Sequence, residues 1–480
     1  MRKILSILIA IIFMMNMVSC EDDKYVSSSD VRLGFSVRAI KFDTVFPTIG
    51  SATQHLKVYN SYDQKVLISN IRLASGKDSG FRLTINGVAA NELHDVEIPP
   101  HDSIYIFVEV AAGIGEKDLP FVVKDSIVFK TNENFQDVDL MAWGQDVVLV
   151  PGSITGSVNW TAEKPYLVNS GTRVERGAVL TIAPGTRVHF HNGTGLYVRG
   201  KVIAEGSLLQ PIIFQGDRLE SIYKNIPDQW NGILLFSGSQ DNVFNHVEIK
   251  NANIGLQVGT IENEGSASVV IGNSKIYNHA YAGIFALKSK VRTYNTLITN
   301  CGLYGAALLV GGEYEFYHST IANYTAGFST QSRTTASLLI SDHVIVDQDD
   351  ESVTYTGNLK KAYFANTIVA GDIAGGNEVE LARSGDAAFN FRFEHCLLQL
   401  NDTFNISQGS RYHSVLKGAD PKFRDPLREM NFELDSLSPA KDAGAPEVSQ
   451  LFPFDMLNQS RTGDDGPDLG AYERIEKKLE

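Results

Sequence analysis

A short phrase that recurs between residues 244 and 400 constrains the fold more than any other feature of the chain. Each phrase begins with Asn or His and closes on an apolar residue: Ile249, Ile276, Ile298, Ile321, Val346, Val369 and Leu398. The closing residues are 27, 22, 23, 25, 23 and 29 positions apart. A period of this size predicts a solenoid, because one coil cannot bury its apolar face alone and has to stack on its neighbours.

A second ladder, of Asn residues, runs two positions behind the first. It comprises Asn251, Asn278, Asn300 and Asn323, and the glycines that follow them are Gly255, Gly283, Gly305 and Gly327. Asn and Gly tolerate the left-handed backbone of a tight bend, and stacked Asn side chains can hydrogen-bond from coil to coil. Strand, Asn bend, glycine and strand is the order typical of a parallel β-helix. We therefore predict an all-β chain in which residues 151–410 form a right-handed parallel β-helix, the hand expected of parallel crossovers.

The start of the chain predicts export. Arg2 and Lys3 precede an apolar run over residues 4–18, which is short for a membrane span and typical of a secretory signal over residues 1–19. The small residue before Cys20 resembles the lipobox of bacterial lipoproteins, and this resemblance implies a lipidated Cys20 that anchors the mature chain in a membrane. The alternative is an ordinary signal peptide followed by an unrelated Cys.

An acidic cluster, Glu21-Asp22-Asp23, follows at once. In some Gram-negative groups such a cluster beside the lipidated Cys resembles a signal for export to the cell surface. The alternative is the solvated start of an acidic and Ser-rich linker over residues 20–30. The predicted location is the outer membrane, at the cell surface.

Residues 31–150 contain short alternating strands separated by turn signals, which predicts a β-sandwich. Examples are the runs 81–85 and 103–108. The runs 42–60 and 99–108 resemble immunoglobulin-like anchor domains of bacterial surface proteins. This resemblance implies a fold and an anchoring role, and it says little about a ligand.

Residues 174–214 repeat short apolar alternations between Gly and Pro-Gly turns. They resemble the opening coils of right-handed parallel β-helix proteins of the pectin-lyase-like superfamily. The runs 438–444 and 468–473 resemble the terminal module of many secreted β-helix proteins. Because a solenoid end exposes unpaired strand edges and apolar interior, we expect residues 411–480 to form a capping module over that end.

The charge and the cysteines limit the possible partners. The chain carries 42 Lys and Arg against 56 Asp and Glu, a formal net charge of −14. Such a chain gains no global attraction to nucleic acid or polyuronates, so we expect no nucleic-acid partner, and an acidic ligand would need a local basic patch or bridging cations. Cys301 and Cys396 lie several coils apart beside apolar ladder positions, which predicts two buried free thiols.

The β-helix proteins that this chain resembles include two classes of enzyme. The lyases use calcium and an Arg or Lys base, and the hydrolases use several Asp. Gln348-Asp349-Asp350 superficially resembles the paired Asp of β-helix polygalacturonases, but the other motifs of that family are missing from the chain. Asp464-Asp465 could hold a cation or form a structural turn, and Asp217, Arg218 and Glu220 come from one loop. We predict no catalytic residue, no metal ligand and no cofactor, with calcium expected only if the chain is a lyase.

Two further sets of residues recur in the coils. His246, His318, His343 and His395 share their repeat position with Asn, which favours hydrogen bonding at a bend over metal ligation. Tyrosines are frequent, as at Tyr277, Tyr281, Tyr294, Tyr304, Tyr314, Tyr317 and Tyr324. Aromatic faces stack on sugar rings, and we predict Tyr281 and Tyr304, in the bend between Asn and Gly, as a glycan platform. The alternative is ordinary stacking between coils.

Together these features predict a lipid-anchored cell-surface protein that binds or adheres to a polysaccharide or a surface protein without catalysis. The first alternative is a polysaccharide lyase or glycoside hydrolase that acts in a groove of the β-helix. The second is a structural spacer. Fold alone does not choose among these functions, because β-helices carry both binding and catalytic sites.

Overall fold

The computed structural model describes residues 24–45, 53–110, 121–144, 146–261, 265–324, 333–348, 351–373 and 375–475. Two compact units divide the chain, Met1–Asp146 and Val147–Glu480. Across the described residues, no helix combines the length and the apolar character that crossing a membrane requires.

The first unit is a β-sandwich of two five-stranded sheets, with strand orders β1-β3-β8-β5-β6 and β2-β10-β9-β4-β7. Alternation along each strand builds it: Ile104, Ile106 and Val108 are buried, whereas Tyr105 and Phe107 between them are exposed. The strands are β1 (Gly34–Phe35), β2 (Ala39–Val45), β3 (Gln54–Tyr59), β4 (Val66–Leu73), β5 (Phe81–Ile85), β6 (Val88–Ala89), β7 (Glu92–Ile98), β8 (Ser103–Val110), β9 (Phe121–Thr131) and β10 (Asn134–Gly144).

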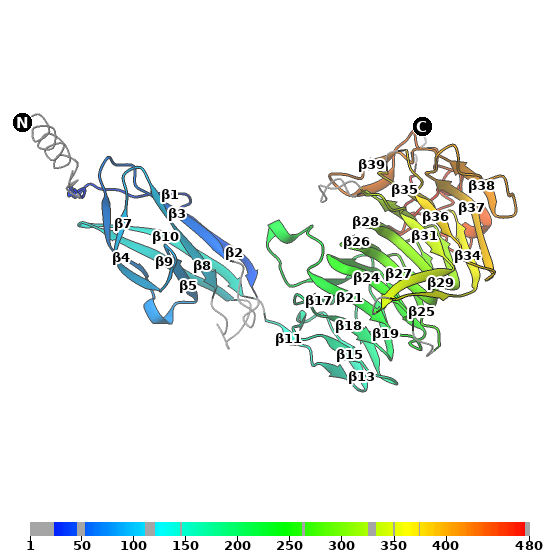
Figure 1. Ribbon diagram of the computed structural model, residues 1–480, viewed down its shortest axis with the longest axis horizontal. Helices are drawn as coiled ribbons and strands as arrows, with labels where there is room; N and C mark the ends of the chain where they lie inside the picture. The colour runs from blue at the N-terminus through cyan, green and yellow to red at the C-terminus, as the bar shows by residue number, and fades with distance from the viewer. Residues whose placement is uncertain are drawn as a thin grey trace, which may run out of the picture. The chain divides into compact units, whose positions relative to one another are not determined.

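The second unit is a parallel β-helix (Figure 1). The strands of its coils pair in parallel, each with the strand one coil earlier and one coil later, and so form three stacks that we name sheets A, B and C. Crossovers of this kind are right-handed. The sequence prediction of a β-sandwich followed by a right-handed parallel β-helix is confirmed.

The three sheets share most of the chain between residues 148 and 417. Sheet A contains β11 (Val148–Leu149), β14 (Tyr166–Val168), β17 (Arg187–Phe190), β20 (Ile212–Gly216), β23 (Val247–Lys250), β26 (Lys275–His279), β28 (Leu297–Cys301), β30 (Thr320–Asn323) and β35 (Ile368–Gly371). Sheet B contains β12 (Ser153–Ile154), β15 (Thr172–Val174), β18 (Gly195–Val198), β21 (Trp230–Leu235), β24 (Ala252–Val258), β31 (Leu338–Ser341), β36 (Val379–Ala382) and the first halves of β27 (Ala282–Tyr294) and β29 (Tyr304–Tyr317). Sheet C contains β13 (Ser157–Trp160), β16 (Val179–Ile182), β19 (Lys201–Glu205), β22 (Asn242–Asn245), β25 (Ser268–Gly272), the second halves of β27 and β29, β34 (Leu359–Ala365), and the starts of β37 (Phe389–Leu398) and β38 (Tyr412–Lys417).

Six of the seven predicted apolar rungs lie in register on sheet A. The register runs Ile249, Ile276, Ile298, Ile321, Val369 and Leu398, and all six side chains are fully buried. The interior also holds an aromatic stack, in which Phe316, Phe364 and Phe393 follow one another with ring centroids 4.9 Å apart. Cys301 and Cys396 are buried free thiols, as predicted, and burial raises the pKa of both to about 12.

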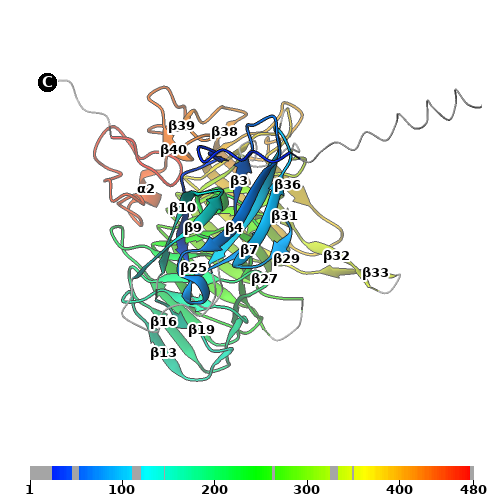
Figure 2. The same ribbon diagram turned by 90° about the vertical axis from the view of Figure 1, so that its left-hand side faces the viewer.

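The prediction that Val346 forms the seventh rung is wrong. Residues His343–Gln348 form β32, which pairs antiparallel with β33 (Glu351–Thr356) instead of joining a sheet of the solenoid. The hairpin projects from the coils (Figure 2). The coil from Ile321 to Val369 is therefore 48 residues long, because it carries an insertion close to one coil in length.

The predicted Asn ladder occupies the corner between sheets A and B. Asn251, Asn278 and Asn300 have left-handed φ angles of 64°, 59° and 53°. The coil-to-coil hydrogen bonds expected between these amides do not form, since Oδ1 of Asn251 and Oδ1 of Asn278 have no partner. Asn323 instead binds the backbone of the preceding coil, accepting from Cys301 N at 2.6 Å and donating to Cys301 O at 2.7 Å.

Residues 418–475, which we name the flank module, lie along the outer face of sheet A. The module contains β39 (Phe423–Asp425), β40 (Asn431–Leu434) and the short helix α2 (Pro446–Ser449), all visible in Figure 2. Outward-facing apolar residues of four successive coils pack against it: Leu297, Ala322, Ile368 and Leu397. The segment thus covers a side of the solenoid, and not its end as we expected. At the end, Phe404 and Ile406 pack on the core of the last coil.

Candidate functional site

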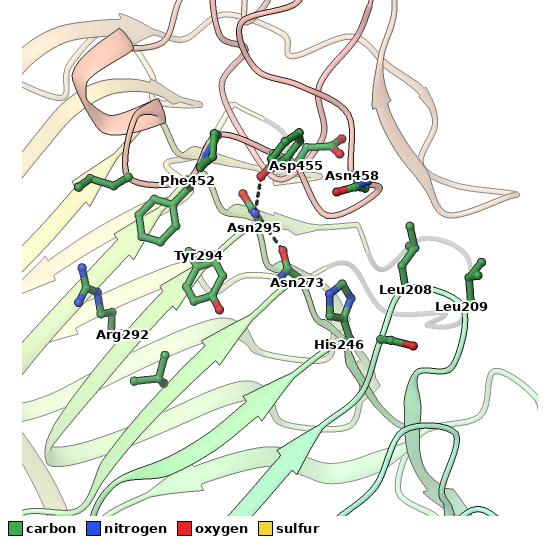
Figure 3. A pocket seen from close by; sticks show the side chains of 15 residues that line it. Leu208, Leu209, His246, Asn273, Arg292, Tyr294, Asn295, Phe452, Asp455 and Asn458 are labelled. Atoms are coloured by element: carbon green, nitrogen blue, oxygen red, sulfur yellow. Dashed lines mark hydrogen bonds between the residues drawn. The ribbon is translucent and has the colours of Figure 1, made fainter.

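An open cleft of about 860 Å³ lies where the flank module meets the corner between sheets C and A (Figure 3). Three separate parts of the chain line it. They are residues 207–209 in a turn before β20, residues of the corner and of sheet C such as His246, Asn273 and Arg292, and residues 451–458 of the flank module. Because these parts are far apart in sequence, the cleft exists only in the folded unit.

The floor of the cleft is a chain of oriented amides. Asn273 donates to Asn245 Oδ1 and Asn295 donates to Asn273 Oδ1, both at 2.9 Å. Asn273 and Asn295 have left-handed φ angles of 49° and 45°, so the conformation that turns the corner also aims their side chains. Hydrogen bonds between the amides of successive coils therefore form at the corner between sheets C and A. The sequence had indicated them at the next corner, between sheets A and B.

The floor is tied to a buried ion pair of the flank module. Arg461 donates to Asn295 Oδ1 at 3.0 Å and to Glu473 at 2.9 Å, and both charged side chains are fully buried. Burial lowers the pKa of Arg461 and raises the pKa of Glu473. Asn295 also donates to the carbonyl of Phe454 at 2.8 Å. The module thus holds the amides of the floor in one orientation.

An aromatic wall stands beside the floor. The rings of Tyr294 and Phe452 stack with centroids 4.8 Å apart and planes 17° apart. Gly272 makes room for Tyr294, because a Cβ at Gly272 would lie 2.2 Å from the Tyr294 ring. Burial raises the pKa of Tyr294, so its hydroxyl is neutral and can both donate and accept hydrogen bonds at physiological pH. The Arg292 guanidinium lies next to this wall, 5.3 Å from the Tyr317 ring centroid and 3.6 Å from Glu315.

The rim of the cleft is apolar and exposed. Leu209 is 91% exposed and Phe454 is 50% exposed, and Leu208 and Leu451 are exposed beside them. An apolar rim over a polar floor suits a ligand with both apolar faces and hydrogen-bonding edges.

The ionisable groups of the cleft are poorly placed for acid–base chemistry. Of the described residues that line it, only Asp455 carries a carboxylate, and that group accepts from the backbone N–H groups of Leu457, Gln459 and Glu473. Burial raises the pKa of Asp455 and lowers the pKa of His246. Glycoside hydrolysis usually needs two carboxyl groups across the scissile bond. Within the described ranges, no three His, Cys, Asp or Glu side chains converge as metal ligands do.

Tyr281 and Tyr304, the predicted glycan platform, lie on successive coils beside sheet B, and neither lines the cleft. Their ring centroids are 6.2 Å apart with planes at 64°, an edge-to-face pair, and Phe285 packs on Tyr281 at 74°. Both side chains are half-buried. Tyr304 also packs near Leu287 and Leu309, so part of its surface serves the fold.

The other acidic candidates do not meet in one place. Asp217 is bonded to His191 of the preceding coil at 2.7 Å, and Arg218 lies 3.3 Å from Glu220. Asp349 and Asp350 lie outside the described residues. Asp464 and Asp465 follow Thr462-Gly463 in the flank module, and neither lines the cleft.

Of the four histidines predicted at the repeat position, His318 and His395 lie at the corner between sheets C and A and make separate hydrogen bonds, whereas His343 lies in the hairpin. His318 Nε2 lies 2.9 Å from Ser449 Oγ, and His395 Nδ1 lies 3.0 Å from the carbonyl oxygen of Ala443. His343 Nδ1 lies 2.8 Å from Asp342 Oδ1 at the base of the hairpin. These distances fit a hydrogen-bonding role for this position.

The sequence analysis missed the cleft, because Phe452 approaches Tyr294 only through the packing of the flank module on the corner. One local signal was present: Gly272 stands directly beneath Tyr294 in the register of sheet C. A glycine under a large aromatic residue indicates a side chain that lies flat across the neighbouring strand.

These pairings define the class of the second unit, a parallel β-helix with a lateral module. Neither a protein-family model nor a curated protein sequence matches the chain. Among solved structures, the chain is similar to the periplasmic chaperone SfaE at 15% identity, covering 25% of this chain and 61% of that one, with a TM-score of 0.18.

Two further similar structures are pectate lyase Pel9A and the catalytic unit of a thermostable GH87 α-1,3-glucanase from Streptomyces thermodiastaticus strain HF3-3. For the lyase the identity is 15%, the coverage 69% of this chain and 86% of that one, and the TM-score 0.28. For the glucanase the identity is 12%, the coverage 76% of this chain and 88% of that one, and the TM-score 0.26. The fold assignment rests on the strand pairing of the chain itself.

Proposed function

We propose that this protein is a non-catalytic carbohydrate-binding protein of the cell surface, and that the cleft beside the flank module holds part of a glycan chain. The observation that carries the proposal is the aromatic wall of Tyr294 and Phe452 next to the Asn273 amide, which a hydrogen bond from Asn295 orients. A sugar ring has an apolar face and a hydroxyl-rich edge, so it matches an aromatic surface bordered by fixed donors and acceptors.

The same geometry favours binding over the enzymatic alternative. The one carboxylate among the described lining residues already accepts three backbone hydrogen bonds, and the nearby guanidinium of Arg292 pairs with Glu315. Neither group is free to take a proton from a sugar. A polysaccharide lyase or a glycoside hydrolase would need an acid–base pair built elsewhere on the coils.

Affinity gel electrophoresis tests the proposal. The purified protein would be run through gels that contain neutral or uronate polysaccharides, and the same mixtures would be assayed for new reducing ends and unsaturated uronates with and without calcium. We expect retention by at least one polysaccharide and no product. Release of product would show that the protein is an enzyme and not a non-catalytic binding protein. Failure of every polysaccharide to retain the protein would overturn the proposal.

A variant pair locates the binding site. Phe452→Ala removes one ring of the aromatic wall, and because an aromatic contact contributes about 0.5–1.5 kcal/mol beyond its area, we expect about tenfold weaker retention. Leu437→Ala is the control, since Leu437 is 72% exposed on the same module and does not line the cleft. Equal retention of the two variants would remove the cleft from the proposal.

Tyr281 and Tyr304 remain a proposed second contact for the glycan. Changing both to Ala should abolish retention with little change in melting temperature if they form a platform. Wild-type retention of the double variant would exclude them as a contact, and loss of the fold would make them core residues.

We also propose that Cys20 is lipidated and anchors the protein at the outer membrane, on the cell surface. Residues 1–23 lie outside the described residues, so this proposal rests on the sequence pattern around Cys20. Cys20→Ala should move the protein from the membrane fraction to the soluble fraction on cell fractionation. A variant that stays in the membrane fraction would refute the anchor.

A further inference from the structure

A groove of about 350 Å³ on the outer side of sheet C, near the last coils, is lined by four cationic side chains: Lys360, Lys361, Arg392 and Arg411. None of the described residues that line this groove carries a carboxylate. The aromatic residues Tyr363, Phe389 and Phe391 line it as well. Such a groove is unexpected in a chain whose formal net charge is −14.

The groove belongs to a longer cationic band on sheet C. A second groove of about 360 Å³ lies on the same sheet. The charged residues that line it are Lys290, Arg292 and Lys361 together with Asp241, Glu313 and Glu315. Lys361 lines both grooves, and Arg292 lines both this second groove and the cleft beside the flank module. The three hollows therefore follow one another across sheet C.

The glutamates of this band are outnumbered by the cations around them. Glu313 lies 3.3 Å from Lys290 and 3.5 Å from Lys360, and Glu315 pairs with both Arg292 and Lys361. Each of these carboxylates is thus shared by two cations.

The same excess continues at the end of the band. Glu394 lies 3.0 Å from Arg392 and accepts from the hydroxyl of Tyr363 at 2.6 Å. Arg411 lies over the Phe391 ring at 4.7 Å. Six Lys and Arg side chains therefore face four carboxylates, those of Asp241, Glu313, Glu315 and Glu394, and the surplus positive charge is held at neighbouring coils about 4.8 Å apart.

We propose that this cationic band binds the acidic groups, carboxylates or sulfate esters, of an anionic polysaccharide that extends from the cleft along sheet C. This inference rests on the proposed function and names the class of glycan. Direct contact with Lys and Arg supplies the local attraction that an acidic protein otherwise lacks. The coil spacing is close to the length of one sugar ring, so successive coils can meet successive sugars, while the part-buried ring of Tyr363 offers apolar surface to them.

The test compares polysaccharides with the same backbone and different charge. Affinity electrophoresis of the purified protein with dextran and with dextran sulfate isolates the effect of sulfate, and alginate supplies carboxylates instead. We expect stronger retention by one of the two anionic chains than by dextran, and weaker retention as salt is raised, because salt screens exposed charges. Equal retention by dextran and both anionic chains would overturn the inference and leave the proposed function in place.

A charge-matched pair of variants assigns the effect to the band. Lys360→Gln with Arg411→Gln should weaken retention by the anionic chain about tenfold, because each substitution removes one solvent-accessible contact with an acidic group. The control, Lys201→Gln with Arg428→Gln, changes the net charge equally outside the grooves. The same loss in both variants, or stronger binding of single-stranded RNA than of either anionic glycan, would contradict the inference.

Discussion

At the residue scale, the corner between sheets C and A shows how one backbone requirement produces the polar floor of the cleft. Six residues there have φ angles between 42° and 49°: His246, Asn273, Asn295, His318, Asn366 and His395. Asn and His adopt this left-handed conformation more readily than most residues. Five of these side chains, all except that of His246, form hydrogen bonds to neighbouring amides or to the flank module. The alternation of Asn and His in the repeat thus follows from conformation and hydrogen bonding together.

Asn366 gives a direct test of this double role. Its buried amide donates to Ala445 O at 3.1 Å and accepts from Ala445 N at 2.7 Å. Asn366→Gly keeps the left-handed bend but loses both bonds, so we expect the free energy of unfolding to fall by about 2 kcal/mol. Asn366→Ala also strains the bend, and should lose about 1 kcal/mol more. Denaturant titration measures both, and equal values for the two variants would contradict the role of the bend.

The buried carboxyl group of Asp468 should make the free energy of unfolding depend on pH. Its buried carboxylate accepts from Asp442 N and Arg474 N, and burial raises the pKa of Asp468 from 3.8 to about 6. The folded state therefore holds this proton more tightly than the unfolded state. The resulting stabilisation is complete below about pH 4 and is lost as the pH rises through 6, a change of about 2–3 kcal/mol.

Denaturant titrations between pH 4 and pH 8 would measure this loss. Asp468→Asn cannot titrate, so its stability should change less over this range than that of the wild type. Because other carboxylates also titrate, the comparison is between the two slopes. Parallel slopes would mean that Asp468 does not hold a proton in the folded state.

At the element scale, the sequence predicted the strands that repeat and failed where an element only resembles a repeat. Val346 has the spacing and the apolar pattern of a rung, but β32 pairs with β33 by antiparallel bonds. Apolar periodicity reports which residues are buried, and it does not report the pairing partner. The cleft was unpredictable for a related reason, because Leu208, Tyr294 and Phe452 are joined only by tertiary packing.

Removal of the β32–β33 hairpin tests whether it is an addition to the coils. Gly357 N donates to Asp342 O at 2.8 Å, so its two ends are already adjacent and Gly-Gly can replace residues 343–356. The coils should keep their circular-dichroism spectrum. Val344 and Tyr355 pack over Leu309, so the deletion should also lower the melting temperature and promote self-association in light scattering.

The control for the hairpin deletion is Ile345→Thr. Ile345 is 59% exposed and lies outside that apolar cluster, so the substitution should change neither property. Loss of the strand spectrum in the deletion variant would show that the coils require the hairpin.

At the scale of the whole molecule, the sandwich and the β-helix each have an apolar core of their own. We therefore expect two transitions in calorimetry, and Asn366→Ala should lower only the one that belongs to the β-helix. A bound polysaccharide should raise that same transition, because a ligand stabilises the unit that binds it. A single transition that is shifted both by Asn366→Ala and by the bound polysaccharide would show that the two units unfold together.

The flank module also sets an order of assembly. The turn at residues 207–209 is synthesised early, and residues 451–458, which complete the cleft, follow after every coil. Nascent coils can stack as they emerge, but Asn295 and Asn366 meet their partners in the flank module only when this late segment arrives. A chain that stops before it would be a stacked solenoid without the cleft. A complete cleft therefore marks a chain whose translation and folding have both been completed.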